Sequence, residues 1–282
     1  MTTEHRFISF DETPIFYSRH GAQNTKKAVL IILHGMGEHG GRYRILSDAL
    51  AGLGIETYLP DLRGYGKSGG PRGHVKSFSD FHRDLEALHR LAGKQNPGAP
   101  IFILGHSFGG LVAASYAALG GVNPAPPLGV SGLILSSPLF GLFHKIPGWR
   151  HGVAVVASKL APRHTEKTQV NPALLTHDKL LLERYGSDPL SHYDISVRLY
   201  TELIGMLGRK DEIATKLTLP LLLLQAGDDR IVSKEAAVDF FNKAASADKE
   251  SQIYDGFYHE ILNEIGREAV FARLGNWVLK HI

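Results

Sequence analysis

The feature that most constrains the fold is a series of short apolar segments separated by longer amphipathic ones. Six segments have the length and composition of buried strands: 28–33, 56–59, 101–104, 133–135, 220–225 and 252–254. Helical patterns lie between them, as in 78–95, where Phe81, Leu85, Leu88 and Leu91 share one face. The alternation predicts an α/β fold with a mostly parallel sheet and helices on both faces.

Two further patterns define the expected domain organisation. Residues 7–10 and 14–18 flank the turn-forming Asp11-Glu12-Thr13 and predict an antiparallel hairpin. About 80 residues separate the strand that ends near Leu135 from the strand that begins at Pro220, far more than a simple crossover needs. We therefore expect one domain with a core, 1–140 and 218–282, and a helical cap, 141–217, above the carboxyl ends of the strands.

Composition excludes several classes of function. None of the 282 residues is cysteine, so disulfides, thiol catalysis and thiolate metal sites are excluded. The net charge is only +3, and the basic residues are scattered along the sequence rather than gathered in one stripe. We therefore expect no nucleic-acid partner. The amino terminus lacks a signal-like apolar run and no apolar segment reaches 18 residues, so we expect a cytoplasmic protein that does not span a membrane.

The segment Gly105-His106-Ser107-Phe108-Gly109 joins the strand 101–104 to a helix-forming run, 111–118. In this G-x-S-x-G pattern a sharp turn pushes the serine outward, and the glycines let the strand and the helix approach each other. Ser107 is therefore a candidate nucleophile. The alternative is a glycine-rich turn whose serine has no catalytic role.

A serine nucleophile needs a base and an acid that orients the base. In this class of fold they follow later strands, in the order Ser, then Asp or Glu, then His. The strand 220–225 runs into Asp228 and Asp229, and the strand 252–254 runs into His259. The residues by themselves leave both aspartates open as the acid.

The oxyanion of acyl transfer needs two backbone N–H donors. One is expected from Phe108, the residue after the candidate nucleophile, and the other from Met36, in the turn after the strand 28–33.

Two segments imitate cofactor motifs. Residues 64–69 fit G-x-G-x-x-G, but the glycines and proline that follow prevent the helix that phosphate binding requires. A P-loop fails as well, because Asp61 stands where the first glycine belongs. His34, Glu38 and His39 have the wrong spacing for a zinc-binding helix. We expect no cofactor and no metal.

Six segments together resemble one family of enzymes. They are HGMGEHGGRY, DLRGYGKSGG, GHSFGG, SDPL, AGDDRIV and GFYHEIL, and they run from about Leu30 to Glu264. They resemble the monoacylglycerol lipases and the bacterial enzymes labelled lysophospholipases. The resemblance implies an α/β-hydrolase fold and a cofactor-free serine hydrolase for esters of one long acyl chain. The alternatives are an esterase or thioesterase for smaller substrates and a non-catalytic binding protein of the same fold.

The resemblance also assigns the catalytic residues. It implies that Ser107 is the nucleophile and His259 the general base. It selects Asp229 over Asp228, because the acid of the family directly precedes a basic residue and a short apolar pair, here Arg230-Ile231-Val232.

The same motifs imply further site residues. Met36 and Phe108 match the oxyanion-hole positions, and Glu38 and Arg42 match an element near the head-group end of the pocket. The chain departs from the animal members in two ways. Leu262 stands where they carry a second histidine that helps to hold glycerol, and the cysteines near their site are missing.

The early cap sequence, LFGLFHKIPGWRHGVAVVASKLAP, mixes apolar and basic residues. They are Leu139, Phe140, Leu142, Phe143, Ile146, Trp149, Val153, Val155, Val156 and Leu160, with Lys145, Arg150 and Lys159 among them. Such mixtures are typical of segments that lie in a membrane interface, so one hypothesis is a lid that contacts lipid peripherally. The other is that these side chains pack inward and line the pocket.

Overall fold

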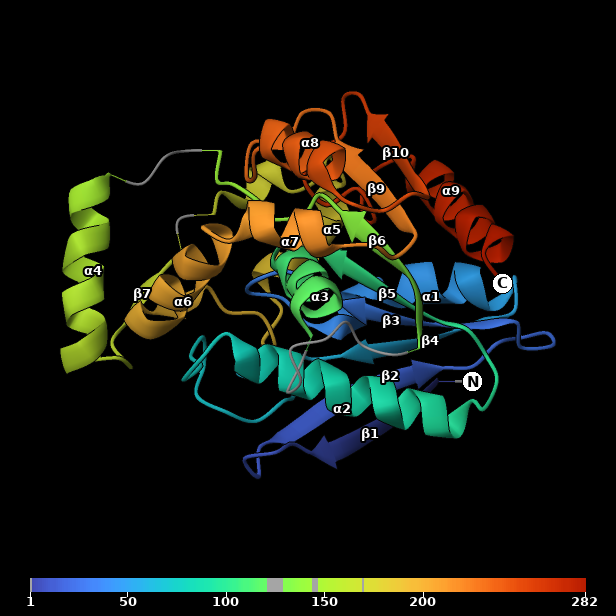
Figure 1. Cartoon of the computed structure of the whole chain (residues 1–282), viewed down its shortest axis with the longest axis horizontal. Coiled ribbons are helices and arrows are strands. Elements are labelled where there is room, and N and C mark those ends of the chain that lie inside the picture. The colour runs from blue at the N-terminus through green and yellow to red at the C-terminus, as the bar shows by residue number, and fades with distance from the viewer. Residues whose placement is uncertain (1, 121–128, 144–146, 169) are drawn as a thin grey trace.

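An eight-stranded sheet runs through the molecule in the order β1-β2-β4-β3-β5-β6-β9-β10 (Figure 1). The structure is a computed structural model that describes residues 2–120, 129–143, 147–168 and 170–282. The strands are β1 (Thr2–Ile8), β2 (Pro14–His20), β3 (Ala28–Leu33), β4 (Ile55–Pro60), β5 (Ile101–His106), β6 (Val130–Ser136), β9 (Leu221–Ala226) and β10 (Lys249–Tyr254). From β4 to β10 every pair is parallel, while β2 is antiparallel to both of its neighbours. The predicted α/β class is confirmed.

Helices cover both faces of the sheet, because parallel strands bury apolar side chains on each side. The helices are α1 (Arg44–Ala51), α2 (Ser79–Gln95), α3 (Phe108–Leu119), α7 (Lys210–Lys216), α8 (Lys234–Lys243) and α9 (Arg267–Lys280), with the 3-10 turn η1 (Gly40–Tyr43) before α1. One apolar core joins the sheet to α2, α3, α7 and α8, and it includes Phe81 and Phe240. The other core joins the sheet to α1 and α9, and it includes Leu46 and Trp277.

The predicted hairpin is confirmed, but the edge strands are longer than the apolar pattern indicates. β1 begins at Thr2 rather than near residue 7, and β10 begins at Lys249 rather than at residue 252. Both strands lie at the edges of the sheet and carry exposed polar side chains. Backbone pairing and polar contacts such as those of Glu250 with Arg273 and Lys280 hold these strands, so hydrophobicity does not mark where they start.

The connection between β6 and β9 contains helices and a small second sheet. Its elements are α4 (Gly148–Leu160), β7 (Thr165–Lys167), the 3-10 turn η2 (Pro172–Leu174), α5 (Lys179–Gly186), β8 (Asp194–Ser196) and α6 (Val197–Leu207), followed by α7. β7 and β8 pair in an antiparallel manner, so the connection, which was expected to be helical, also contains a small two-stranded sheet. A three-residue strand has too few residues to show an alternating pattern. The limits 141–217 of the cap remain a prediction.

The apolar residues of the early cap divide into an inward and an outward set. Leu139 and Phe140 are buried, and the Phe140 ring stacks on Phe240 of α8 with a centroid distance of 3.8 Å. For these two residues the alternative of inward packing holds, since they complete the core beside β6. Lys145 and Ile146 lie outside the described residues.

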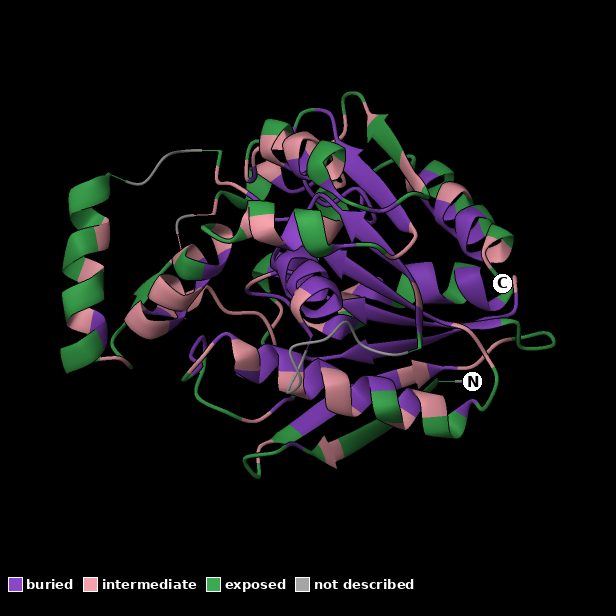
Figure 2. Cartoon of the chain, viewed as in Figure 1, coloured by how far each residue is buried: buried purple, intermediate pink, exposed green. Residues whose placement is uncertain are grey.

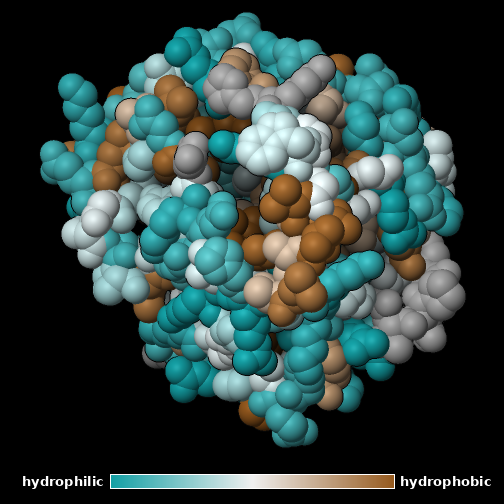
Figure 3. Space-filling model, turned by 90° about the vertical axis from the view of Figure 1, so that its left-hand side faces the viewer, coloured by the Kyte–Doolittle hydropathy of each residue, from teal (hydrophilic) through white to brown (hydrophobic). Residues whose placement is uncertain are grey.

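The outward set lies on α4, which projects from the body of the molecule beside α6 and is mostly exposed (Figures 1 and 2). Trp149, Val153, Val156 and Leu160 are 68, 61, 59 and 83 % exposed. The face that carries α4 shows an apolar patch next to a hollow (Figure 3). None of the described helices combines the length and the apolar character that crossing a bilayer would require.

Candidate active site

The candidate nucleophile lies on a sharp turn between β5 and α3. Ser107 has φ 52° and ψ −118°, a strained backbone for a residue with a side chain. The flanking glycines are required by close packing, because a Cβ at Gly105 would lie 2.3 Å from the Gly109 oxygen. A Cβ at Gly109 would lie 2.4 Å from the Leu33 oxygen. The turn thus holds Ser107 at the carboxyl end of β5, beside the turn that follows β3.

The structure brings Asp229 and His259 together from the ends of β9 and β10. His259 Nδ1 donates to Asp229 Oδ2 at 2.8 Å, and both residues are buried. The backbone N–H groups of Ile231 and Val232 donate to Asp229 Oδ1 at 2.9 and 3.0 Å. Asp228 is exposed and points elsewhere, so Asp229 is the aspartate that meets the histidine.

The pair perturbs the acidity of both members. Burial lowers the pKa of His259, but the Asp229 carboxylate beside it outweighs burial, and the pKa lies above its usual 6.5. Burial raises the pKa of Asp229, and the contact with His259 more than offsets this, so that pKa lies below its usual value. His106 packs against His259 with a ring-centroid distance of 4.9 Å, and burial lowers the pKa of His106 to about 3. Because His106 is neutral, it does not repel a positive charge on the neighbouring His259.

Ser107 and His259 line the same cavity, but the Ser107 hydroxyl has no hydrogen bond to any described residue. Catalytic hydrogen bonds are often incomplete before substrate binds. The arrangement supplies a hydroxyl, an imidazole with a free Nε2 and a carboxylate that orients the imidazole, which are the parts that covalent acyl transfer needs.

The candidate oxyanion donors come from two neighbouring turns. Met36 lies after β3 and Phe108 begins α3, and neither backbone N–H has an acceptor among the described residues. The N–H of Gly35, by contrast, is taken by the Glu38 carboxylate. His34 donates from Nδ1 to the Gly35 oxygen at 2.7 Å and accepts at Nε2 from the Leu62 N–H at 2.9 Å. Both nitrogens of His34 are thus occupied, which leaves none for a zinc ion.

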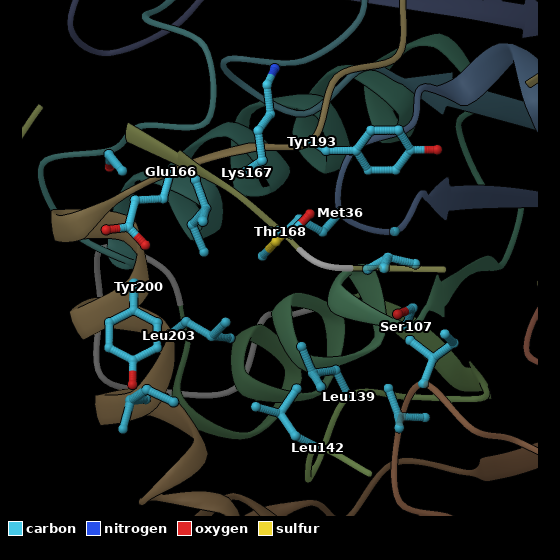
Figure 4. A pocket seen from close by; sticks show the side chains of 18 of the residues that line it. Met36, Ser107, Leu139, Leu142, Glu166, Lys167, Thr168, Tyr193, Tyr200 and Leu203 are labelled. Carbon is cyan, nitrogen blue, oxygen red and sulfur yellow. The ribbon is translucent and has the colours of Figure 1, made fainter. Parts of the chain in front are cut away.

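A cavity of about 950 Å³ opens beside Ser107, between the strand ends and the segment that joins β6 to β9. Its apolar walls include Leu139, Leu142, Val153, Leu203 and Ile204. Figure 4 shows Ser107 and Met36 on one side and Tyr200 and Leu203 of α6 on the other. The cavity therefore extends from the candidate catalytic residues at the strand ends to α6.

Glu38 and Arg42 lie at the reacting end, where the motifs placed them. Both side chains are nearly buried and line the cavity. They meet Glu260, whose Oε1 accepts from Arg42 Nη1 at 3.3 Å. Sequence reasoning missed Glu260, although it directly follows His259 in the segment GFYHEIL.

The loop after α5 also reaches the site, and sequence reasoning gave it no role. The His192 N–H donates to the Gly37 oxygen at 3.1 Å, in the turn that carries Met36. His39 Nε2 donates to Asp188 Oδ2 at 2.9 Å. Asp188 belongs to the quoted segment SDPL, which was the available signal.

Comparison with known proteins places the chain among serine hydrolases. Residues 24–266 match the family model described as serine aminopeptidase, S33. Phospholipase YtpA of Bacillus subtilis is 34 % identical over 86 % of this chain and 92 % of its own length. Human monoglyceride lipase is 32 % identical over 90 % of this chain and 83 % of its own. A soluble variant of the Saccharomyces cerevisiae monoglyceride lipase, solved with a substrate analog, superimposes with a TM-score of 0.87 at 26 % identity, covering 100 % of this chain and 95 % of that one.

The fold, the sequence relatives and the solved structure all indicate the same family of serine ester hydrolases, which includes monoacylglycerol lipases and bacterial phospholipases. The chain belongs to this α/β-hydrolase family, which the serine aminopeptidase S33 model describes.

Proposed function

We propose that this protein hydrolyses esters of one long acyl chain and a small hydroxylated head, as in monoacylglycerol, with Ser107 as the nucleophile. The observation that carries the proposal is the buried Asp229–His259 pair beside a large, mostly apolar cavity that Ser107 also lines. The names of the monoglyceride lipase relatives support the choice of substrate.

In the proposed reaction Ser107 Oγ attacks the ester carbonyl carbon, and its proton passes to His259 Nε2. The carbonyl oxygen becomes an oxyanion that accepts hydrogen bonds from the backbone N–H groups of Met36 and Phe108. The intermediate then collapses, the bond to the head alcohol breaks, and His259 returns the proton to the leaving oxygen. Water, deprotonated by His259, attacks the acyl-enzyme and releases the fatty acid. Asp229 orients the imidazole and stabilises its charged form throughout.

The apolar walls of the cavity support a long acyl chain. Its volume of about 950 Å³ is at the upper end of the range for ligand sites. Burial of each methylene favours binding by about 0.8 kcal/mol. We therefore expect kcat/KM to rise with chain length until the cavity is full, whereas an esterase or thioesterase for small substrates would show no such trend.

We also propose that α4 contacts a lipid surface peripherally. Its exposed apolar side chains lie beside Arg150 and Lys159, which suits the boundary between acyl chains and anionic head groups. Trp149 and Val153 of the same helix line the cavity. A substrate that left the lipid surface at α4 would therefore enter the cavity directly.

A panel of substrates tests the proposed activity. The wild-type protein is offered monoacylglycerols of increasing chain length, short soluble esters, lysophosphatidylcholine and an amino-acid amide, the last because the family model bears a peptidase name.

Ser107→Ala should lower ester turnover by roughly three to six orders of magnitude and abolish labelling by a fluorophosphonate, whose phosphorus reacts with an activated serine. Ser251→Ala, at an exposed position of β10, is the matched control. Labelling that persists in Ser107→Ala would contradict the assignment, and labelling absent from the wild type would favour a binding protein.

A further inference from the structure

A buried cluster of three charged side chains lines the cavity at its reacting end. Arg42 Nη1 lies 3.3 Å from Glu260 Oε1 and 3.6 Å from Glu38 Oε2, and the three side chains are only 4 to 6 % exposed. Two carboxylates thus share one guanidinium. The formal charge of the cluster is −1, in a part of the protein that water screens poorly.

Three neutral side chains donate hydrogen bonds to the carboxylates of the cluster. Tyr43 donates to Glu38 Oε1 at 2.8 Å, and Tyr185 and Asn263 donate to Glu260 Oε2 at 2.8 and 3.0 Å. These three groups are neutral hydrogen-bond donors.

A chain of hydrogen bonds connects the cluster to one more acidic group. Ser191 links Arg42 to the Asp188 carboxylate, which His39 contacts. Of the other basic residues that line the cavity, Arg150, His164, Lys167 and Arg230 are exposed. His106 and His259 are buried; burial lowers the pKa of His106 to about 3, and His259 is paired with the Asp229 carboxylate. Lys167 points away from Ser107 (Figure 4). Charges in contact with water are screened, so the buried excess of negative charge dominates at the reacting end.

The cluster lies where the head of an ester would sit. A Cβ at Gly35 would be 2.6 Å from Glu38 Oε1 and 3.3 Å from Ser107 Cβ, so this carboxylate and the serine flank the same glycine. Glu260 directly follows His259. The leaving alcohol must stay close to both Ser107 and His259, because His259 protonates it.

The cluster also keeps two polar atoms unsatisfied. Glu38 Oε2 and Arg42 Nε are buried without a hydrogen-bond partner among the described residues. One is an acceptor and the other a donor, and a hydroxyl group can serve both. A buried unsatisfied polar atom costs free energy, so a ligand that pairs with it is favoured.

We infer that Glu260 is a specificity-determining residue that excludes esters with a negatively charged head. Without Glu260 the remaining pair, Arg42 and Glu38, would be neutral and could accept a phosphate through the guanidinium. With Glu260 the cluster carries a net negative charge, and the reacting end repels an anion while it still accepts an uncharged polyol. This inference rests on the proposed function and narrows its substrate class to uncharged hydroxylated heads.

The test compares two substrates that differ only in the phosphate, 1-octanoylglycerol and 1-octanoylglycerol 3-phosphate, both used below the concentration at which they form micelles. The readout is the ratio of their kcat/KM values. One buried charge at about 8 Å, with an effective dielectric constant of about 20, corresponds to about thirtyfold. We expect wild type to prefer the uncharged ester and Glu260→Gln to reduce that preference by about this factor. A fault in folding or in loop position would lower both kcat/KM values and leave the ratio unchanged.

Two more variants keep the test decisive. Glu38→Gln removes the other carboxylate, while its amide oxygen can still accept from Gly35 and Tyr43, and it should shift the ratio in the same direction. Glu264→Gln neutralises a buried carboxylate of the same loop that does not line the cavity, and it should leave the ratio unchanged. An unchanged ratio in both Glu260→Gln and Glu38→Gln would overturn the inference, although hydrolysis of octanoylglycerol by wild type would still support the proposed function. A wild type that cleaves neither ester would overturn both.

Discussion

At the scale of single residues, the contact between His259 and Asp229 predicts how the activity depends on pH. In the proposed reaction His259 accepts a proton from Ser107 only when its imidazole is neutral, and the Asp229 carboxylate raises the pKa of His259 above 6.5 despite burial. Activity should therefore fall as pH decreases through that raised pKa. We expect the acidic limb of kcat/KM for a short soluble ester to have its midpoint above pH 6.5 with a slope of about one. A midpoint below 6.5, with the fold intact by circular dichroism, would contradict this.

The two adjacent aspartates offer a matched pair of variants. Asp229 accepts from His259 at 2.8 Å, whereas Asp228 is exposed. Asp229→Asn should lower kcat by roughly ten thousandfold, because an amide can hold the imidazole in the wrong tautomer. Asp228→Asn should change kcat less than about threefold. The measurement is kcat of both variants on one ester, and a reversed order of effects would exclude Asp229 as the triad acid.

At the scale of elements, substitutions in α4 test the proposed contact with lipid. Val156 and Leu160 are exposed on α4 and do not line the cavity. Replacing both with Ser removes apolar area that would enter the lipid, and we expect binding to vesicles of phosphatidylcholine and phosphatidylglycerol to weaken by at least about tenfold. Turnover of a short soluble ester should stay the same.

Leu180→Ser serves as the control for that experiment, because Leu180 is 68 % exposed on α5 rather than on α4. Co-sedimentation with vesicles measures binding for all three proteins. If the α4 double variant sediments like wild type, the proposed lipid contact of α4 is wrong.

At the scale of the whole molecule, the β6–β9 connection contacts the turn that carries Met36, a candidate oxyanion donor. Asp188 accepts from His39 and from Ser191, and this contact joins the loop after α5 to the turn that carries Met36. We expect Asp188→Asn to lower kcat about tenfold with little change in KM, because a displaced Met36 N–H stabilises the oxyanion less well.

The control for this prediction is Asp194→Asn. Asp194 pairs with the exposed Lys167 and lies in the same connection. Its replacement should leave kcat unchanged on the same ester. Equal kcat values for Asp188→Asn and wild type would show that the contact does not position the turn.

The sequence by itself determined the buried strands of the sheet and the order of the candidate catalytic residues along the chain. Buried parallel strands are apolar throughout, and they therefore stand out, as in β3, whose limits were predicted correctly. The strained turn at Ser107 needs Gly105 and Gly109 at fixed positions, so it leaves a local pattern. Edge strands lack such a pattern, because most of their side chains are polar and exposed.

Tertiary structure alone decided which side chains meet. Glu260 meets Arg42 across 218 residues of sequence, and Phe140 turns inward because Phe240 of α8 offers a ring to stack on. Composition gives Phe140 and Trp149 the same apolar character, yet one is buried and the other exposed. Burial and charge pairing depend on which side chains surround a residue in space. When those side chains come from distant segments, the local sequence does not predict them.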